Sequence, residues 1–320
     1  MAINMKQKHF LQSEDWGRVQ AGLGKAVVYR EGEDWSYQAL IGPNPGRIGK
    51  FIKCVFIPYG PSFSSQRGLK MALEDVLELA LEHKADQIVV EPYDIADSGD
   101  ISSLMAGYKK LAKSRQPELT LVTDLSVSWE EVLQGMSKTN RYQWKYLERD
   151  KLSFTKSYDP ESVADFSDMM SATTKRTGAH FPAKSYYEHI LKTLGPEKKA
   201  GLIYGYHDNQ KLVGTLFIDD FNTKRRYYLY AGSYDAMRNV KPALNAALVM
   251  YLQKDAQEAG QLSLDYFGVA PVDAEKDHPW YGLSKFKRSL GGKDYATLGT
   301  WEKNLNKPKV SLIKLVQKIV

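Results

Sequence analysis

Apolar and polar positions follow two spacings along this chain. Short runs rich in β-branched and aromatic residues, bounded by turn residues, predict strands; they occupy residues 24–30, 35–42, 50–60, 86–92, 120–125, 200–207, 211–221, 225–233 and 262–269. Apolar residues that recur every three or four positions predict helices; they occupy residues 64–84, 126–136, 157–178, 185–195 and 239–260. Strands and helices therefore occur throughout the chain.

Two helix boundaries carry their own capping signals. Ser128 precedes Glu131 by three positions, which is the pattern of a capping box. Asp159 is followed by Pro160, a residue suited to the first helical position, and the same periodic segment closes at Gly178. We therefore expect helices to begin at Ser128 and Asp159.

The two halves of the chain repeat one order of elements without a detectable sequence repeat. Each half has antiparallel strands, then a long helix, then an apolar strand, and such a crossover favours a mixed α/β sheet. A chain of 320 residues also exceeds the usual size of a single core. We predict two α/β domains, residues 1–148 and 149–306, related by duplication of one module.

The last residues, 307–320, place apolar side chains at helical spacing with lysines opposite. The simplest interpretation is a terminal helix that packs on the first domain; association with a membrane surface is the alternative, because both kinds of helix show the same pattern. The pattern alone does not separate these two interpretations.

Composition and charge limit the class of partner. Hydrophobic residues make up 43% of the chain, which is typical of a globular protein, and the net charge of +6 arises from 44 Lys and Arg against 38 Asp and Glu. Because the two signs are interleaved, we expect a local cationic groove for an anionic partner rather than a DNA-binding surface. No apolar stretch is long enough to span a bilayer, so we expect a cytoplasmic protein.

Several common kinds of chemistry lack their motifs. The six histidines are scattered and the single cysteine, Cys54, lies in an apolar run, so we expect neither a metal site nor a disulfide. The nucleophile elbow, the phosphate-binding loop of nucleotide hydrolases and the glycine-rich dinucleotide loop are all missing. We therefore predict that the protein uses no cofactor.

Residues 282–292, GLSKFKRSLGG, combine cations with an apolar stripe. On a helical wheel the stripe consists of Leu283, Phe286 and Leu290. Lys287 flanks this stripe, whereas Lys285 and Arg288 lie on the opposite side. The wheel therefore suggests that Lys287 points into a cleft, although a lysine stem lying along apolar surface has the same pattern.

Two predicted strands add polar side chains near this helix. Tyr228 and Tyr230, at a spacing of two, are expected on one face of a strand, where they stack on a base or sugar or simply pack in the core. Asp265 and Gly268 are expected near the end of another strand.

Five ordered blocks together resemble one family. Residues 10–20, 140–154, 227–233, 261–271 and above all 282–292 look like the Fem family (FemA, FemB and FemX), aminoacyltransferases that build the interpeptide bridges of peptidoglycan. The resemblance implies two GNAT-like domains in tandem. The coiled-coil arm of FemA and FemB has no room in residues 183–205, so the chain is closer to the armless, FemX-like members.

The resemblance implies transfer of an amino acid from aminoacyl-tRNA to an amine of a peptidoglycan precursor. The donor ester is already activated, so the enzyme positions the amine and stabilises the oxyanion, and needs no nucleophile. By similarity, Lys287 is catalytic. The residues implied to bind aminoacyl-tRNA are Phe286, Lys285, Arg288, Lys293, Tyr228 and Tyr230.

The precursor-binding residues are matched more loosely. The candidates are Lys25, Lys184 or its competitor Arg176, Tyr187, Glu91 and Asp265. The acceptor is either a nucleotide-linked or a lipid-linked precursor. A lipid-linked acceptor would place the protein at the inner face of the membrane. We expect the protein to be a monomer. An acyl-CoA-dependent N-acyltransferase and a non-catalytic RNA-binding protein are the alternative functions.

Overall fold

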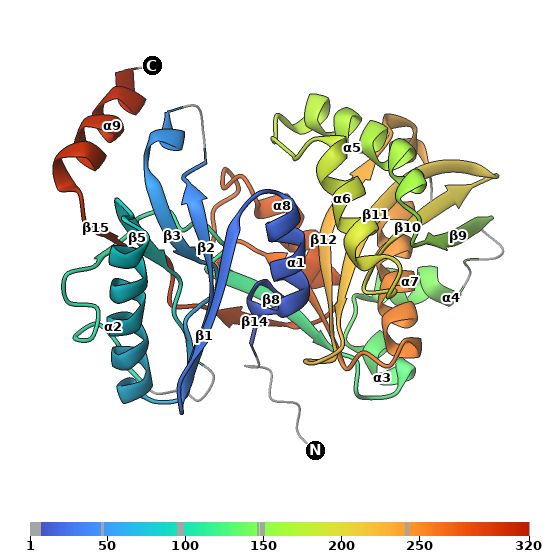
Figure 1. The fold of residues 1–320 in the computed structure, drawn as a ribbon. Helices are drawn as coiled ribbons and strands as arrows, with labels where there is room; N and C mark the ends of the chain where they lie inside the picture. The colour runs from blue at the N-terminus through green and yellow to red at the C-terminus, as the bar shows by residue number, and fades with distance from the viewer. Residues whose placement is uncertain are drawn as a thin grey trace. The chain divides into compact units, whose positions relative to one another are not determined.

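The computed structural model describes residues 8–45, 48–94, 99–145, 147, 151–240 and 243–319. The chain forms two compact units, which are described separately (Figure 1). Unit 1 comprises Leu119–Tyr295, and unit 2 comprises Asn4–Glu118 together with Ala296–Val320. Unit 1 is therefore an insertion into the sequence of unit 2.

Unit 2 is a mixed sheet with helices on both faces. Its strands are β1 (Ala26–Glu31), β2 (Trp35–Pro43), β3 (Lys53–Ile57), β4 (Ser62–Phe63), β5 (Gln87–Val90), β6 (Tyr93–Asp94), β7 (Lys109–Lys110) and β15 (Trp301–Asn304), and its helices are η1 (Phe10–Gln12), α1 (Glu14–Gly22), η2 (Gly49–Phe51), α2 (Gln66–Glu82) and α9 (Lys307–Ile319). Among the described residues the order across the sheet is β6-β4-β2-β3-β5-β15-β7, with β1 paired to β2. The apolar stripe of α2 packs on Tyr37, Ala39 and Ile41 of one face. The alternate residue Gln38 meets η1 and α1 on the other face.

Unit 1 repeats this plan with longer strands. Its strands are β8 (Leu119–Asp124), β9 (Leu152–Ser157), β10 (Ala200–His207), β11 (Gln210–Asp220), β12 (Arg225–Ser233), β13 (Ser263–Gly268) and β14 (Lys293–Ala296). Its helices are α3 (Trp129–Gln134), α4 (Lys138–Lys145), η3 (Pro160–Ser162), α5 (Val163–Thr177), α6 (Lys184–Leu194), η4 (Asp235–Asn239), α7 (Leu244–Glu258) and α8 (Tyr281–Ser289). The sheet order is β14-β8-β13-β12-β11-β10-β9.

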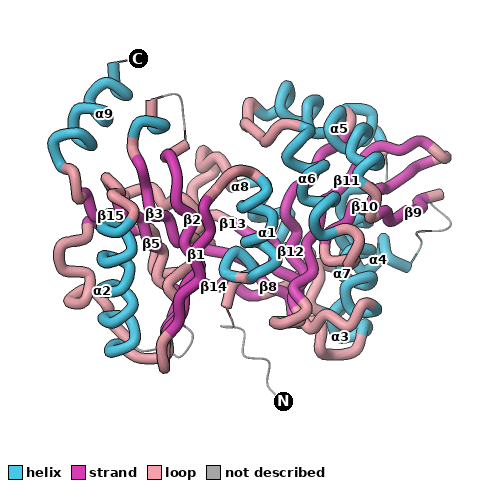
Figure 2. The backbone as a smooth tube through the Cα atoms, viewed as in Figure 1, coloured by secondary structure: helices cyan, strands magenta, loops and turns pink. Residues whose placement is uncertain are grey.

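The sheet of unit 1 is covered on both faces, which explains its long apolar strands (Figure 2). Helix α7 packs on β9, β10, β11 and β13, and α5 and α6 pack on β10, β11 and β12. Gly232 marks the α5 face, because a side chain there would collide with the backbone of Met169 and Met170.

The repeated order predicted from the sequence is present in both units. Strands β3 and β5 are parallel neighbours joined through α2, and β12 and β13 are parallel neighbours joined through α7. The helix starts are confirmed as well: Ser128 and Glu131 form a capping box, Asp159 caps η3 with Pro160 at its first turn, and Gly178 ends α5 in the left-handed conformation.

The unit boundaries differ from the predicted limits at 148, a residue outside the described set, and 306. Strand β8 pairs with β13, and Trp129 of α3 lies in the core of unit 1, so residues 119–145 belong there. Strand β15 pairs with β5, which assigns it to unit 2. Both differences arise from strand pairing between segments far apart in the sequence, which local patterns do not reveal.

Helix α9 is held on unit 2 by one face. Val310 is fully buried, and Lys309 Nζ lies 2.6 Å from Asp86 Oδ2. Lys314 Nζ lies 2.6 Å from Glu302 Oε1. In the part of the chain that the structure describes, no helix is long and apolar enough to cross a membrane.

A buried ion cluster stabilises the α7 side of unit 1. The Arg226 guanidinium is completely buried and donates to both oxygens of Asp219 at 2.7 Å and to Asp255 Oδ2 at 2.6 Å. Lys156 reaches the other oxygen of Asp255 at 2.5 Å. Because charges inside a protein need partners, this cluster ties β11, β12, α7 and β9 together.

Candidate functional site

The buried face of α8 is polar. Ser284 and Lys287, three positions apart, are the buried residues within this helix, while Leu283 is 44% exposed. The predicted apolar stripe is therefore wrong at Leu283, although Leu290, just after the helix, is buried as expected. Ser284 Oγ accepts from the backbone N–H of Ala270 at 2.7 Å, which fixes α8 against the segment after β13.

Lys287 points inward, as the wheel predicted. Its side chain is 5% exposed, and Nζ donates to the backbone oxygen of Gly268 at 2.7 Å. Burial lowers the pKa of Lys287 to about 8, and the nearby charge of Asp265 opposes that shift. Perturbed lysines of this kind are typical of functional sites.

Asp265 is buried beside Lys287. The Thr120 hydroxyl and the backbone N–H of Phe267, the latter at 2.8 Å, donate to the same carboxylate oxygen of Asp265. Burial raises the pKa of Asp265, while Arg225, Thr120 and Lys287 act in the opposite direction. Phe267 has a φ of 61°, and the pairing of β13 with β8 shifts register at this point. This bulge turns the end of β13 toward the lysine.

The lysine lies where two parallel strands stop pairing. Strands β12 and β13 are paired from Arg225 to Tyr227 and from Ser263 to Asp265, although β12 continues to Ser233 and β13 to Gly268. Ligands of open α/β sheets bind at the carboxyl ends of strands where the connectivity changes. Gly268, the hydrogen-bond partner of Lys287, is the last residue of β13.

The other cationic side chains of α8 and β14 differ in solvent exposure and in their partners. Lys285 and Lys293 are exposed. Arg288 is half-buried; it donates to Asp294 at 2.7 and 3.2 Å and to the backbone oxygen of Ala270 at 2.6 Å. Phe286 is half-buried and packs on the core of unit 1. The open-face position expected for Arg288 is therefore wrong, because Asp294 holds its guanidinium.

Tyr228 and Tyr230 do not share a face. Tyr228 packs on Tyr266 in the α7-side core, whereas Tyr230 packs on Tyr186 and Tyr187 of α6. Their partners explain the difference: Phe217 pairs with Tyr228 and Leu216 with Tyr230, so one extra residue on β12 forms a bulge. Since a shift of one residue moves side chains to the opposite face, the predicted shared face is wrong.

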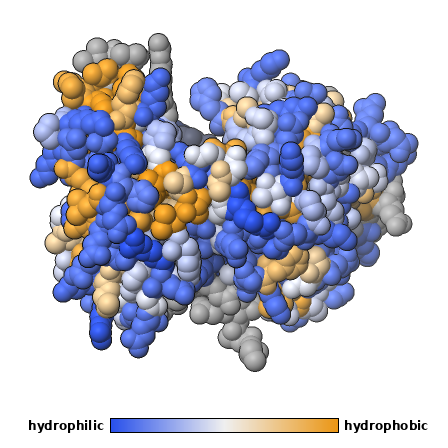
Figure 3. Space-filling view, viewed as in Figure 1, coloured by the Kyte–Doolittle hydropathy of each residue, from blue (hydrophilic) through white to orange (hydrophobic). Residues whose placement is uncertain are grey.

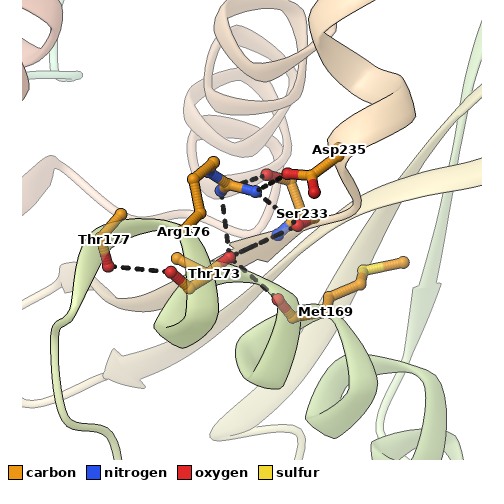
Figure 4. A network of polar contacts seen from close by, with 6 residues as sticks. All are labelled: Met169, Thr173, Arg176, Thr177, Ser233 and Asp235. Atoms are coloured by element: carbon orange, nitrogen blue, oxygen red, sulfur yellow. Dashed lines mark hydrogen bonds and ion pairs between the residues drawn. The ribbon is translucent and has the colours of Figure 1, made fainter.

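The end of α5 holds Arg176 in a polar network (Figure 4). Its guanidinium donates to Asp235 Oδ1 at 2.9 Å, to Ser233 Oγ at 3.0 Å and to Thr173 Oγ1 at 3.3 Å. The Thr173 hydroxyl in turn accepts from the Ser233 backbone N–H at 3.0 Å. These bonds join α5 to the end of β12.

Lys184 and Tyr187 lie on the neighbouring helix α6. Lys184 is exposed at its first position and pairs with Glu188 at 3.2 Å. Glu188 lines an open cavity of about 320 Å³ together with Pro160, Glu161, Ser185, His189 and Lys192. Tyr187 is fully buried among aromatic rings, and its hydroxyl has no hydrogen-bond partner in the described residues.

Lys25 and Glu91 belong to unit 2. Lys25 Nζ donates to the Pro43 backbone oxygen at 3.2 Å. Glu91 is buried and accepts from the Thr300 hydroxyl at 2.6 Å and from the backbone N–H groups of Gln116 and Tyr59 at 2.9 and 3.1 Å. Burial raises the pKa of Glu91. Its oxygens thus connect three segments of unit 2.

Within the described residues, no cluster of three or more histidine, cysteine, aspartate or glutamate side chains has the geometry of a metal site. The described groups around Lys287 are its own ammonium group, the buried carboxylate of Asp265, the hydroxyls of Thr120 and Ser284, and backbone polar groups.

Comparison with known proteins agrees with this arrangement. Residues 197–318, which include β13, α8 and Lys287, match the model of the FemAB family. This part of the chain is therefore similar to the FemAB family. The chain is 22% identical to a lipid II:glycine glycyltransferase of Staphylococcus aureus over 385 alignment positions, which cover 96% of this chain and 90% of the relative.

Solved structures share the fold of this chain. FemX is 21% identical, with a TM-score of 0.79 over 97% of this chain and 96% of FemX. L-PGS from Bacillus licheniformis has a TM-score of 0.55 at 12% identity, over 92% of this chain and 89% of that one. The likeness to FemX supports the predicted fold of two α/β units in tandem. Residues 195–199 join α6 directly to β10, as predicted for an armless member.

Sequence reasoning missed two side chains near Lys287. Thr120, on β8, reaches Asp265 from a segment distant in sequence, and no local pattern indicates this contact. Ser284 is a polar residue three positions before Lys287 on the same helix face, and its spacing offered a usable signal.

Proposed function

We propose that this protein transfers an amino acid from aminoacyl-tRNA to an amine of a peptidoglycan precursor. The observation that carries the proposal is the buried Lys287 at the end of β13, within the region that matches the FemAB family. The glycyltransferase named for lipid II, to which the chain is similar along most of its length, supports the class of acceptor.

The chemistry needs little from the enzyme beyond position and charge. The acceptor amine attacks the ester carbonyl carbon, the new C–N bond forms, and the bond to the ribose oxygen breaks. The amine loses one proton and the ribose oxygen gains one, so the step is balanced without a covalent enzyme intermediate. Lys287 Nζ has further N–H groups besides the one given to Gly268, and these can donate to the oxyanion.

The donor would be held by the surface around α8. Exposed Lys285 and Lys293 are available for phosphates of the tRNA, whose binding should weaken with salt. Phe286, half-buried beside Lys287, is our candidate for contact with the terminal adenosine. Arg288 would contribute to phosphate binding only by exchanging Asp294 for a phosphate. Tyr228 packs on Tyr266 and the core of unit 1, which argues against a contact with the donor.

The acceptor site stays a prediction in each unit. The candidates are Lys184, Arg176, Tyr187 and Asp265 in unit 1 and Lys25 and Glu91 in unit 2. Both a nucleotide-linked and a lipid-linked precursor fit the proposal, and monomeric state and cytoplasmic location also remain predictions.

The test is a reaction of the purified protein with a panel of charged tRNAs and purified nucleotide-linked and lipid-linked precursors. Mass spectrometry should show a precursor heavier by one aminoacyl residue for at least one pair. Uncharged tRNA and acetyl-CoA serve as control donors. An increment with acetyl-CoA instead, or none with any charged tRNA, would contradict the proposal.

A further inference from the structure

Helix α9 exposes an apolar face away from the body of unit 2. Leu312 is 63% exposed, Leu315 57% and Val316 37%. These residues are three and four positions apart, so they form one stripe. The hydropathy surface shows apolar side chains gathered over α9 (Figure 3). Three large aliphatic side chains together on one exposed helix face indicate an interaction surface.

The contacts of the opposite face of α9 with unit 2 keep the apolar stripe exposed. Val310, about half a turn of the wheel from Leu312, is fully buried. On the same docked side, Lys314 Nζ bonds both oxygens of Glu302 at 2.6 and 2.8 Å. Because these contacts already occupy the docked side, α9 cannot roll to bury the stripe without breaking them.

A fourth exposed apolar residue lies on the adjoining corner of unit 2. Asp86 accepts from Lys309 Nζ at 2.6 Å and from the backbone N–H of Lys53 at 2.9 Å, so α9 and the start of β3 meet at one carboxylate. Two residues before Lys53, Phe51 is 59% exposed, and Lys50 Nζ lies 5.3 Å from the centre of its ring. We call Phe51, Leu312, Leu315 and Val316 the α9 patch.

The exposed charges of the two segments that carry the α9 patch have one sign. The chain has no aspartate or glutamate between Asp34 and Glu74, and none after Glu302. Lys50, Lys53 and Lys307 are exposed in these two segments. The carboxylates that contact α9 are buried: Asp86 pairs with Lys309, and Glu302 pairs with Lys314. These two segments therefore bring exposed lysines and no exposed carboxylate to the α9 patch.

We propose that the α9 patch binds the surface of a membrane that contains anionic phospholipids. Leu312, Leu315, Val316 and Phe51 would enter the boundary between headgroups and acyl chains, and the exposed lysines would lie among the headgroups. Aliphatic side chains can neither donate a hydrogen bond to a phosphate group nor form an ion pair with it, which argues against RNA at this surface. The area that four side chains can bury is smaller than the roughly 800 Å² per partner of a stable protein interface, which argues against a second copy of the chain.

Flotation of the full-length protein with vesicles tests this proposal. The protein should float with vesicles of phosphatidylglycerol and phosphatidylcholine, and float far less with phosphatidylcholine alone or at about 0.5 M salt. The variant Leu312→Ser/Leu315→Ser/Val316→Ser should bind at least about tenfold more weakly. Phe221→Ser/Val272→Ser, which removes exposed apolar side chains from unit 1, is the matched control and should bind like the parent.

The vesicles contain no tRNA or precursor, so the result is independent of the proposed acyl transfer. A second variant, Lys307→Glu, should weaken binding to anionic vesicles without touching any packed side chain, and thermal melting verifies that each variant is folded. Equal flotation of the parent and the triple serine variant would overturn the proposal. So would loss of a dimer in sedimentation of the triple variant, since the patch would then serve a second copy.

Discussion

Asp265 and Lys287 carry opposite charges inside unit 1, and each opposes the effect of burial on the pKa of the other. Burial alone favours the neutral forms of both groups. Thr120 and the backbone of Phe267 donate to the Asp265 carboxylate. The Lys287 ammonium donates to the Gly268 carbonyl. The charge of the lysine therefore depends on groups from β8, β13 and α8 together.

The first prediction concerns the pH dependence of transfer. Because the ammonium form stabilises the oxyanion, kcat should fall as pH rises through the pKa of Lys287, about 8. Asp265→Asn removes the charge that raises this pKa, so the fall should begin at lower pH. Asp294→Asn, which alters the pair with Arg288, should leave the profile in place. A profile that does not move in Asp265→Asn would show that the carboxylate has no influence on the lysine.

The second prediction separates the lysines of α8. Lys287→Met should lower kcat by about 10²-fold or more with a modest change in the KM for charged tRNA. Lys285→Met, on the exposed face, should raise that KM and reduce its salt dependence while kcat stays close to that of the parent. Steady-state kinetics at two salt concentrations measure both. Equal kcat for parent and Lys287→Met would remove Lys287 from the reaction.

The third prediction concerns stability. The pKa of Lys287 is about 8 when folded against 10.5 for an ordinary lysine, so the unfolded chain binds more protons between these values. The cost of burying the charge is therefore fully present below pH 8 and disappears as pH rises toward 10.5. Relative to Lys287→Met, the free energy of unfolding of the parent should rise by about 3 kcal/mol over this window. Urea denaturation at pH 7, 8.5 and 10 measures the difference, and a difference that does not change with pH would contradict the burial effect.

The fourth prediction concerns the buried cluster around Arg226. Arg226→Ala leaves Asp219 and Asp255 without their shared partner and should lower the free energy of unfolding by about 3–5 kcal/mol. Lys151→Ala breaks a pair with Asp208 whose side chains are 70% and 51% exposed, and should cost less than about 1 kcal/mol. Denaturant midpoints of both variants provide the comparison. Similar losses would mean that burial adds nothing to the cluster.

Local features of the fold could be predicted from the sequence, because neighbouring residues determine them. The capping box at Ser128, the cap at Asp159 and the apolar strand runs depend on contacts within one element. The partners of β8 and β15 could not be predicted, since each pairs with a strand far away in the sequence. The unit boundaries therefore had to come from the structure.

The candidate site was predictable to a similar extent. The wheel placed Lys287 inward because helical geometry is regular, and this held even though Leu283 is exposed. The bulge in β12 separated Tyr228 from Tyr230, and no residue type at that position signals it. Lys287 donates its hydrogen bond to the backbone carbonyl of Gly268. Because every residue has a backbone carbonyl, the sequence does not indicate this partner.

The insertion of unit 1 into unit 2 determines the order in which the two sheets can be completed during synthesis. All strands of unit 1 lie between Leu119 and Ala296, but the edge of β5 awaits β15, whose last residue is Asn304. Strand β5, Gln87–Val90, is buried along its whole length in the finished protein. A nascent chain that has passed Tyr295 but not Asn304 thus carries an open apolar sheet edge, which is where premature termination would lead to aggregation.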